Sequence, residues 1–285
     1  LGFAYYGPID GHDLRELTTI LHRLKAVKGP VLLHVTTVKG KGDEFAEADA
    51  CTFHGVGAFD RTSGKSGPAK AGPPSWTEVF GKTLTDLATR DERIVALTAA
   101  MPDGTGLTQF QKAHPSRFFD VGIAESHAVT FAAGLACGGR RPVVALYSTF
   151  LQRAFDQVVH DVAVQKLPVV LAVDRAGLVG EDGATHHGVF DIAYLRPVPN
   201  IVIASPRDEN QLRHLLYTAT RHEGGPFVLR YPRGAAMGVP MDDDYRTIHE
   251  ELRQGLLRFA ERNPLRPHPQ RPARHPDPRL LTHSR

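Results

Sequence analysis

The chain has 285 residues, a length that corresponds to one large domain or two modest ones. Hydrophobic residues make up 41% and charged residues 23%, which excludes a chain that is disordered throughout. The net charge of +3 is local: residues 262–285 hold six Arg and one Asp, so the other residues carry −2 and nothing in the composition demands a basic surface for nucleic acid.

The longest uncharged, largely apolar stretch is residues 128–139, which is shorter than the ~20 residues that a membrane-spanning helix needs. Cysteine occurs only at Cys51 and Cys137, without the spacing of a disulfide framework or a zinc site, as is typical of a reducing compartment. The chain opens at Leu1 rather than Met, so the missing signal peptide says little. We predict a cytoplasmic protein with no membrane partner and no nucleic-acid partner.

A first α/β pattern occupies residues 1–38. Residues 13–25 are typical of an amphipathic helix with leucines on one side, and residues 30–38 of a buried strand. Because this unit lacks upstream partners, we expect it to be the end of a domain. Residues 39–75 lose all periodicity, and Gly, Pro, Lys and Ser dominate near residues 63–74, so we predict an interdomain linker over 39–75.

A second α/β series runs from residue 76 to about residue 245. Strands are predicted at 94–99, 118–122, 143–147, 169–173, 201–204 and 227–231, and helices at 76–89, 125–137, 150–165 and 208–220. Continuous apolar strands that alternate with helices predict an α/β fold with a parallel sheet covered on both faces. Ligands bind such sheets beyond the carboxyl ends of the strands. After residue 245 we expect a tail, disordered over residues 262–285, where Pro, Arg and His replace apolar residues.

Glu125 follows a predicted strand and a glycine turn, in the first turn of helix 125–137. This helix is apolar nearly all round, so we expect it to be buried. The helix N-terminus favours the carboxylate anion, whereas desolvation favours the neutral acid. A carboxyl group balanced in this way suits proton exchange with a bound ligand. The alternative is an ordinary N-terminal helix charge.

The strand that ends at Tyr147 passes directly into polar and aromatic residues, including Phe150 and Arg153. Such a sequence is typical of a sheet edge that faces a ligand. The alternative is that Phe150 and Phe155 lie in the core while Arg153 pairs with Asp156 on the helix surface.

Residues 174–188 combine a strand end and four glycines with Arg175, Asp182 and His186, which is typical of a mobile polar loop that carries catalytic groups. The adjacent His186 and His187 have poor geometry for joint metal ligation, so we predict no metal ligand in this chain. Arg233 closes the last strand, where an arginine can bind a phosphate through two hydrogen bonds. A solvated surface residue is the alternative.

Six short motifs follow one another along the chain. They are Gly-Pro-Ile-Asp-Gly-His at 7–12, Lys-Gly-Lys-Gly at 39–42, Thr-Phe-His at 52–54, Asp-Val-Gly-Ile-Ala-Glu-Ser-His-Ala-Val-Thr-Phe-Ala-Ala-Gly at 120–134, Tyr-Ser-Thr-Phe-Leu-Gln-Arg at 147–153 and Tyr-Pro-Arg-Gly at 231–234. Together they resemble the 1-deoxy-D-xylulose-5-phosphate synthases over roughly residues 1–245. These thiamine-diphosphate enzymes join pyruvate to glyceraldehyde 3-phosphate with loss of CO₂, for isoprenoid, thiamine and pyridoxal synthesis.

The resemblance implies a role for each matching residue. Glu125 would contact N1′ of the aminopyrimidine of thiamine diphosphate, and Phe150 would lie against that ring. Two histidines, His54 and His186, would stabilise or protonate intermediates, with Asp182 assisting at the acceptor aldehyde. The acceptor site would be lined by four residues, the arginines nearest its phosphate: Tyr147, Arg153, Arg175 and Arg233.

The sequence also departs from the family pattern. The Gly-Asp-Gly motif and the Asn that bind Mg²⁺ and the diphosphate are absent, so the Mg²⁺ ligands would lie in a missing first domain. After Lys-Gly-Lys-Gly the family usually places a Tyr near the cofactor, where this sequence has Asp43.

We therefore expect a transketolase-like fragment that is inactive alone. It would comprise the end of a diphosphate-binding domain (1–38), the linker (39–75), a pyrimidine-binding domain (76–245) through which it forms a homodimer, and a tail (246–285). Two alternatives stay open. One is a split subunit that a partner chain completes, and the other is a non-catalytic oligomerising module.

Overall fold

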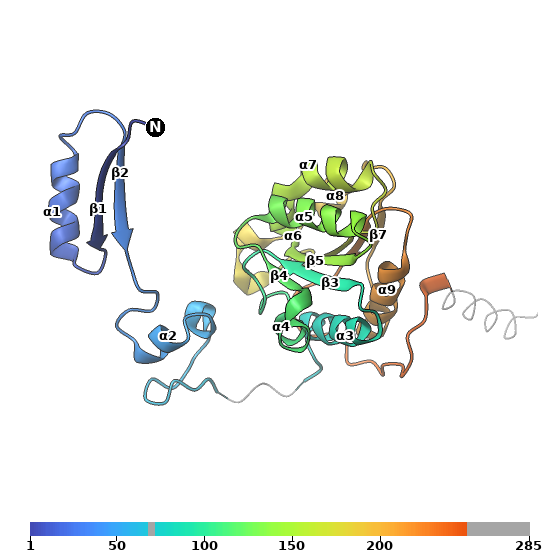
Figure 1. Ribbon diagram of the computed structural model, residues 1–285. Coiled ribbons are helices and arrows are strands. Elements are labelled where there is room, and N and C mark those ends of the chain that lie inside the picture. The colour runs from blue at the N-terminus through green and yellow to red at the C-terminus, as the bar shows by residue number, and fades with distance from the viewer. Residues whose placement is uncertain (68–71, 250–285) are drawn as a thin grey trace, which may run out of the picture. The chain divides into compact units, whose positions relative to one another are not determined.

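A computed structural model describes residues 1–67 and 72–249 of the chain. The chain divides into two compact units, Leu1–Ala71 and Gly72–Arg285 (Figure 1). The tail predicted at 246–285 lies, from residue 250 onward, outside the described residues. In the part of the chain that is described, no helix has both the length and the apolar character needed to cross a membrane.

The first unit is built on a parallel pair of strands joined by a helix: β1 (Ala4–Asp10), α1 (Leu14–Leu24) and β2 (Val31–Thr36). The side chain of Asp13 caps α1 by accepting two backbone amide hydrogen bonds. The sequence pattern predicted α1 and β2 but not β1, because Gly-Pro at residues 7–8 interrupts the strand. Gly7 has a φ of +124°, and a Cβ there would lie 2.4 Å from the His34 carbonyl oxygen, so only glycine fits beside β2.

The segment expected to be a linker contains regular structure within the first unit. It holds a short helix, α2 (Glu44–Ala48), and a 3-10 turn (Thr52–Gly55). Three phenylalanines pack among themselves: Phe53 meets Phe59 edge to face at 5.0 Å between ring centroids and stacks on Phe45 at 6.4 Å. These aromatic contacts explain why residues 39–67 are compact although their sequence shows no periodicity.

The second unit is a six-stranded, all-parallel sheet, which confirms the predicted α/β fold. Its strands are β3 (Ile94–Thr98), β4 (Phe118–Asp120), β5 (Arg141–Tyr147), β6 (Val170–Asp174), β7 (Val202–Ala204) and β8 (Phe227–Arg230). The order across the sheet is β4-β3-β5-β6-β8-β7. From β3 the chain goes to β4 on one side and then returns to β5 on the other. The loops after β3 and β5 therefore diverge, and such a switch point opens a crevice at the carboxyl edge of the sheet.

Helices cover both faces of this sheet (Figure 1). One face carries α3 (Trp76–Arg90), α4 (Thr108–Ala113) and α9 (Glu209–Arg221). The other carries α5 (Glu125–Cys137), α6 (Ser148–Leu151), α7 (Phe155–Gln157) and α8 (Asp191–Leu195). Strand residues alternate between the two cores, so that Ala96 packs under α3 whereas Val95 and Leu97 pack under α5.

Two helix predictions differ from the structure. The helix predicted at 150–165 is a broken series, in which a 3-10 turn follows α6 and a π-helical turn (Val158–Ala163) follows α7. The prediction that helix 125–137 is buried all round is wrong for this chain: α5 buries one face, whereas His127, Thr130 and Cys137 on the other are exposed. Only one side of α5 has a sheet to pack against.

Candidate active site at the carboxyl edge of the sheet

Glu125 is the first residue of α5 and only 3% exposed. The chain reaches it from β4 through Gly122, whose φ of +70° allows the turn into the helix. Arg153 Nη1 donates to Glu125 Oε1 over 2.6 Å, and the Ser126 hydroxyl donates to the Arg153 carbonyl oxygen over 2.6 Å. The start of α5 is thus tied to the segment after β5, and a buried carboxylate is held at a helix N-terminus, where anions are favoured.

Aromatic rings lie beside this carboxylate. Tyr147 ends β5 and stacks on Phe150, with centroids 5.6 Å apart and planes 14° from parallel. The Arg153 guanidinium carbon lies 5.0 Å from the centre of the Phe150 ring. His186 meets Phe150 edge to face at 5.4 Å. Stacked aromatic rings with a guanidinium over one of them and an imidazole at their edge form a setting in which a further aromatic ring can bind once the guanidinium moves aside.

Asp182 joins two of the three arginines that the resemblance places nearest the acceptor phosphate. Its Oδ2 lies 3.3 Å from Arg175 Nε, and its Oδ1 lies 2.8 Å from Arg233 Nε. The loop that carries Asp182 is closed at its base by reciprocal backbone hydrogen bonds between Gly177 and Gly188, of 2.7 and 2.8 Å. The Arg175 and Arg233 guanidinium groups therefore converge on one carboxylate, and each has a second acidic neighbour, Asp174 for Arg175 and Glu181 for Arg233.

Three residues that the sequence reasoning did not assign complete the Arg175 environment. The Gly104 carbonyl oxygen accepts from Arg175 Nη1 over 2.7 Å. The Asp174 carboxylate accepts one hydrogen bond from the Arg175 backbone amide over 2.6 Å and another from the hydroxyl of Thr77, a residue of α3, over 2.7 Å. The polar position of Asp174 at a strand end could have marked it, whereas Gly104 and Thr77 show no sequence signal, because only the tertiary fold brings them to this edge.

Burial raises the pKa of two acidic side chains at this edge. Desolvation raises the pKa of Tyr147 to about 12, so the phenol stays neutral at physiological pH. Desolvation also raises the pKa of Asp174 to about 6, although Arg175 and the Thr77 hydroxyl act in the opposite direction. The edge thus combines an aromatic donor, a carboxyl group that titrates just below neutrality and a pair of cations.

The structure brings eight of the ten predicted site residues into one series of contacts, which we call the carboxyl-edge cluster. Its members are Glu125, Arg153, Phe150, Tyr147, His186, Arg175, Asp182 and Arg233. The alternative pairing of Arg153 with Asp156 is wrong, because Arg153 binds Glu125 instead. The other two residues lie in the first unit, where His54 is exposed and Asp43 caps α2 through the amides of residues 45 and 46. Their roles stay predictions.

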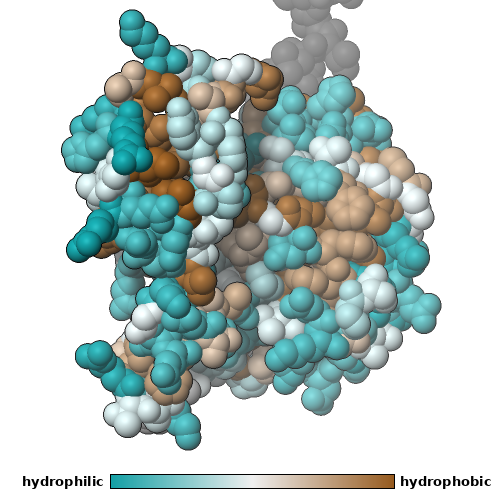
Figure 2. Space-filling model, turned by 60° about the vertical axis from the view of Figure 1, so that its left-hand side comes forward, coloured by the Kyte–Doolittle hydropathy of each residue, from teal (hydrophilic) through white to brown (hydrophobic). Residues whose placement is uncertain are grey.

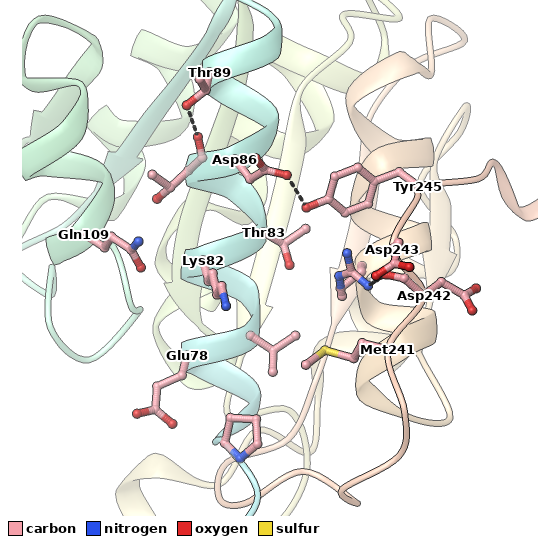
Figure 3. A pocket seen from close by; sticks show the side chains of 14 residues that line it. Glu78, Lys82, Thr83, Asp86, Thr89, Gln109, Met241, Asp242, Asp243 and Tyr245 are labelled. Atoms are coloured by element: carbon pink, nitrogen blue, oxygen red, sulfur yellow. Dashed lines mark hydrogen bonds between the residues drawn. The ribbon is translucent and has the colours of Figure 1, made fainter.

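A different face of the second unit holds a cavity of about 660 Å³ (Figure 3). It runs along α3 and is bounded on the opposite side by residues 241–245, where the Tyr245 hydroxyl donates to Asp86 Oδ2 over 2.7 Å. No member of the carboxyl-edge cluster lines it. Within residues 1–67 and 72–249, no group of three or more His, Cys, Asp or Glu side chains is arranged to hold a metal ion.

Comparison with known proteins gives matches along most of the chain. The family model of the transketolase pyrimidine-binding domain matches residues 72–238, and that of 1-deoxy-D-xylulose-5-phosphate synthase matches residues 1–37. The 1-deoxy-D-xylulose-5-phosphate synthases of Pelotomaculum thermopropionicum and Aquifex aeolicus are 59% and 62% identical over 259 residues. Each alignment covers 90% of this chain but 40% and 41% of the relative, so the chain spans about two fifths of their length.

A solved structure is also similar to this chain. It is described as "Split gene transketolase, inactive beta4 tetramer" and is 33% identical, with a TM-score of 0.54. The match covers 61% of this chain and 57% of that chain.

Proposed function

We propose a function from the premise that this chain belongs to the transketolase pyrimidine-binding domain family. The relatives confirm the resemblance to 1-deoxy-D-xylulose-5-phosphate synthases that the motifs predicted. We infer that the second unit supplies the aminopyrimidine side and the acceptor side of a thiamine-diphosphate site. The reaction would condense pyruvate with glyceraldehyde 3-phosphate with loss of CO₂, in the cytoplasm, for isoprenoid, thiamine and pyridoxal synthesis. The unbroken series of contacts from Glu125 to Arg233 supports this proposal most directly.

The residues present fit the aminopyrimidine of thiamine diphosphate. Glu125 is a buried carboxylate that can hold or move a proton at a ring nitrogen. Phe150 presents an aromatic face beside it, and Arg153 links the two. When bound, thiamine diphosphate supplies the electron sink that decarboxylation of a 2-oxo acid requires. The protein's part at this end of the site is to orient the ring and to set its protonation.

The other end of the carboxyl-edge cluster fits a phosphorylated acceptor. Arg175 and Arg233 can bind the phosphate through charge-assisted hydrogen bonds, in competition with Asp182. Asp182 would then be free to contact the acceptor aldehyde. His186 lies edge to face against both Phe150 and Tyr147, where it would exchange a proton with the reacting carbon chain. Tyr147 and Arg153 would line the remaining walls.

The diphosphate and its Mg²⁺ require ligands that the Gly-Asp-Gly motif supplies in this family, and that motif is absent from the sequence. We therefore propose that a segment outside this sequence supplies them and that the chain alone is inactive. His54 would serve the reaction, and Asp43 would lie near the cofactor, once the first unit is completed in this way. We also propose a homodimer formed through the second unit, which the open face of α5 and the 82% exposed Ile123 before it support.

A second arrangement keeps the same chemistry but divides it between two chains. The similarity to a protein described as a split gene transketolase favours it. In that case a separate chain would contribute the diphosphate ligands, and mixing the two chains would restore activity without a covalent link. A non-catalytic module would gain no activity in either way.

The proposal is tested with a chimaera in which residues 1–249 of this chain replace the matching segment of the Aquifex aeolicus relative. The chimaera is assayed for CO₂ release and for 1-deoxy-D-xylulose 5-phosphate, with pyruvate, glyceraldehyde 3-phosphate, thiamine diphosphate and Mg²⁺. We expect activity in the chimaera and none in the 285-residue chain alone. A folded chimaera that binds thiamine diphosphate but forms no product would contradict the proposal.

A further inference from the structure

Asp174 is a carboxylate in the core of the second unit, at the end of β6, and it is fully buried. Its Oδ1 accepts the backbone amide of Arg175 over 2.6 Å and lies 3.3 Å from Arg175 Nη1. Its Oδ2 accepts the Thr77 hydroxyl over 2.7 Å, from a residue 97 positions earlier in the chain. Asp174 therefore joins α3 to the backbone and the side chain of one arginine.

Arg175 adopts a conformation that returns its side chain toward the sheet. Its φ is +57°, in the left-handed region that non-glycine residues rarely occupy. The guanidinium carbon lies 3.8 Å from the centre of the Tyr147 ring, and Nη1 donates to the Gly104 carbonyl oxygen over 2.7 Å. The side chain is only 15% exposed. The left-handed backbone conformation of Arg175 costs free energy, so the contacts of its side chain must help to stabilise that conformation.

A buried carboxylate is costly unless it is paired, and an apolar pair of the same shape is often no less stable. Removal of one partner alone leaves the other charge buried without compensation, so Asp174 and Arg175 depend on each other. What a neutral residue could not provide is a fixed negative charge directly behind the Arg175 guanidinium.

From this geometry we infer that Asp174 is a positioning residue, which acts through Arg175 by holding its guanidinium over the Tyr147 ring, in position to bind the acceptor phosphate. The inference rests on the proposed function in so far as it assigns that phosphate to Arg175. Loss of the Asp174 charge releases the guanidinium.

The groups that face Asp174 determine how it responds to pH. They are Thr77 from α3, Tyr147 from β5, Tyr231 after β8, and Arg175 with Asp182 beyond it. Burial raises the pKa of Asp174 to about 6, and burial keeps both tyrosines protonated, so among Asp174 and the two tyrosines only Asp174 changes charge near that pH. The interaction of Asp174 with the Arg175 guanidinium should accordingly weaken as the pH falls through about 6 and Asp174 becomes protonated.

The first experiment observes Arg175 directly in the 285-residue chain. Side-chain ¹⁵N NMR resolves the two Nη groups of an arginine when rotation about Nε–Cζ is slow, and Arg175→Lys identifies the signals by their loss. We expect separate Nη signals at pH 8 that merge at pH 5 in the unmodified chain, and merged signals at both pH values in Asp174→Asn. Asp182→Asn is the matched control, because it removes the other carboxylate and should leave the signals separate.

The second experiment measures acceptor kinetics in the chimaera. We expect Asp174→Asn to raise KM for glyceraldehyde 3-phosphate about tenfold at pH 8 with kcat little changed, as for the loss of a charge-assisted contact. The substrate phosphate titrates near pH 6 as well. The ratio of variant to unmodified KM is therefore followed with pH, and it should fall toward one at pH 5.

The outcomes separate this inference from the proposed function. Merged Nη signals together with a raised KM in Asp174→Asn support it. Separate Nη signals at pH 5 in the unmodified chain, or at either pH in Asp174→Asn, overturn the inference that Asp174 holds Arg175. If the variant does not fold, the pH series on the unmodified chain still tests this inference. If Arg175→Ala leaves KM for the acceptor unchanged, the proposed role of Arg175 is wrong, while the NMR result still decides whether Asp174 holds it.

Discussion

The guanidinium of Arg153 covers the carboxylate of Glu125, with 2.6 Å between Nη1 and Oε1 across 28 residues of sequence. The Glu125 side chain is 4% exposed and that of Arg153 is 56% exposed, so a cation in contact with solvent lies over a buried anion. Arg153 can swing outward without disturbing the core. Such a movement would open the carboxylate to a ligand ring that lies on Phe150.

Removal of the Arg153 cation should therefore destabilise the chain through Glu125. Arg153→Leu leaves a buried carboxylate without this partner, and we expect a loss of roughly 1–3 kcal/mol, below the value for a fully buried pair because Arg153 is half exposed. The double variant Arg153→Leu/Glu125→Gln should regain most of that stability. Urea denaturation at pH 7 gives the free energy of unfolding of the unmodified chain, the two single variants and the double variant. Additive losses would show that the two side chains do not interact.

Gly104 should not tolerate a side chain. A Cβ there would lie 2.0 Å from the Tyr147 hydroxyl oxygen, and Tyr147 is held between Phe150 and Arg175. We expect Gly104→Ala to lower stability by about 1–3 kcal/mol through overpacking and to displace Arg175. Gly138→Ala is the control, since its nearest contact would be 3.4 Å, an ordinary van der Waals distance. Equal melting temperatures for both variants would contradict the packing described at Tyr147.

Glu209 at the start of α9 should stabilise the chain in a pH-dependent way. Its carboxylate accepts the backbone amides of residues 237, 238 and 239 over 2.6–3.1 Å. Burial acts to raise the pKa of Glu209, but the backbone amide of Glu209 itself and these three amides together outweigh burial and lower the pKa below 4.5. The stabilisation is thus present above pH 4.5 and is lost as the pH falls through the lowered value.

For Glu209→Gln we expect a loss of roughly 1–3 kcal/mol at pH 7 that shrinks toward pH 3, measured by urea denaturation. Glu92→Gln on the exposed surface is the control and should have little effect at either pH. A loss that is independent of pH would show that the charge of Glu209 is not what binds the three amides.

Substitution of Arg233 should weaken binding of the acceptor, glyceraldehyde 3-phosphate, and leave binding of the donor, pyruvate, unchanged. In the chimaera we expect Arg233→Ala to raise KM for glyceraldehyde 3-phosphate about tenfold or more, because a charge-assisted contact to a non-reacting phosphate is lost. Pyruvate decarboxylation should continue. The control is Arg196→Ala, an exposed arginine of the second unit outside the carboxyl-edge cluster. A change in pyruvate KM alone would place Arg233 at the donor instead.

The sequence was sufficient to predict the sheet of the second unit, because its six strands are short apolar runs that leave little alternative to burial in a parallel sheet. It was insufficient for β1, where Gly7 and Pro8 break the pattern, and for residues 39–67, where Phe53 and its neighbours pack without periodicity. The π-helical turn after α7 has no local signal either. Helix α5 was predicted to be buried all round since periodicity cannot show how many layers cover a helix.

The carboxyl-edge cluster was predictable as a set because its members follow strand ends and match the motifs of one family. Their mutual contacts were not predictable. Asp182 bridging Arg175 and Arg233, and Thr77 reaching Asp174, depend on where loops and α3 lie in three dimensions. The exposed apolar surface, which Figure 2 shows on both parts of the chain, was likewise invisible in the composition.

The proposed role of Glu125 is tested most directly by the turnover of Glu125→Ala in the chimaera, with thiamine diphosphate binding measured in parallel by calorimetry. Loss of the carboxyl group at the ring nitrogen should lower kcat by about 10²–10⁴-fold, as for a lost general acid or base, in a protein that still binds the cofactor. Near-normal turnover in a cofactor-bound Glu125→Ala chimaera would contradict the assignment of the carboxyl-edge cluster as the aminopyrimidine side of the site.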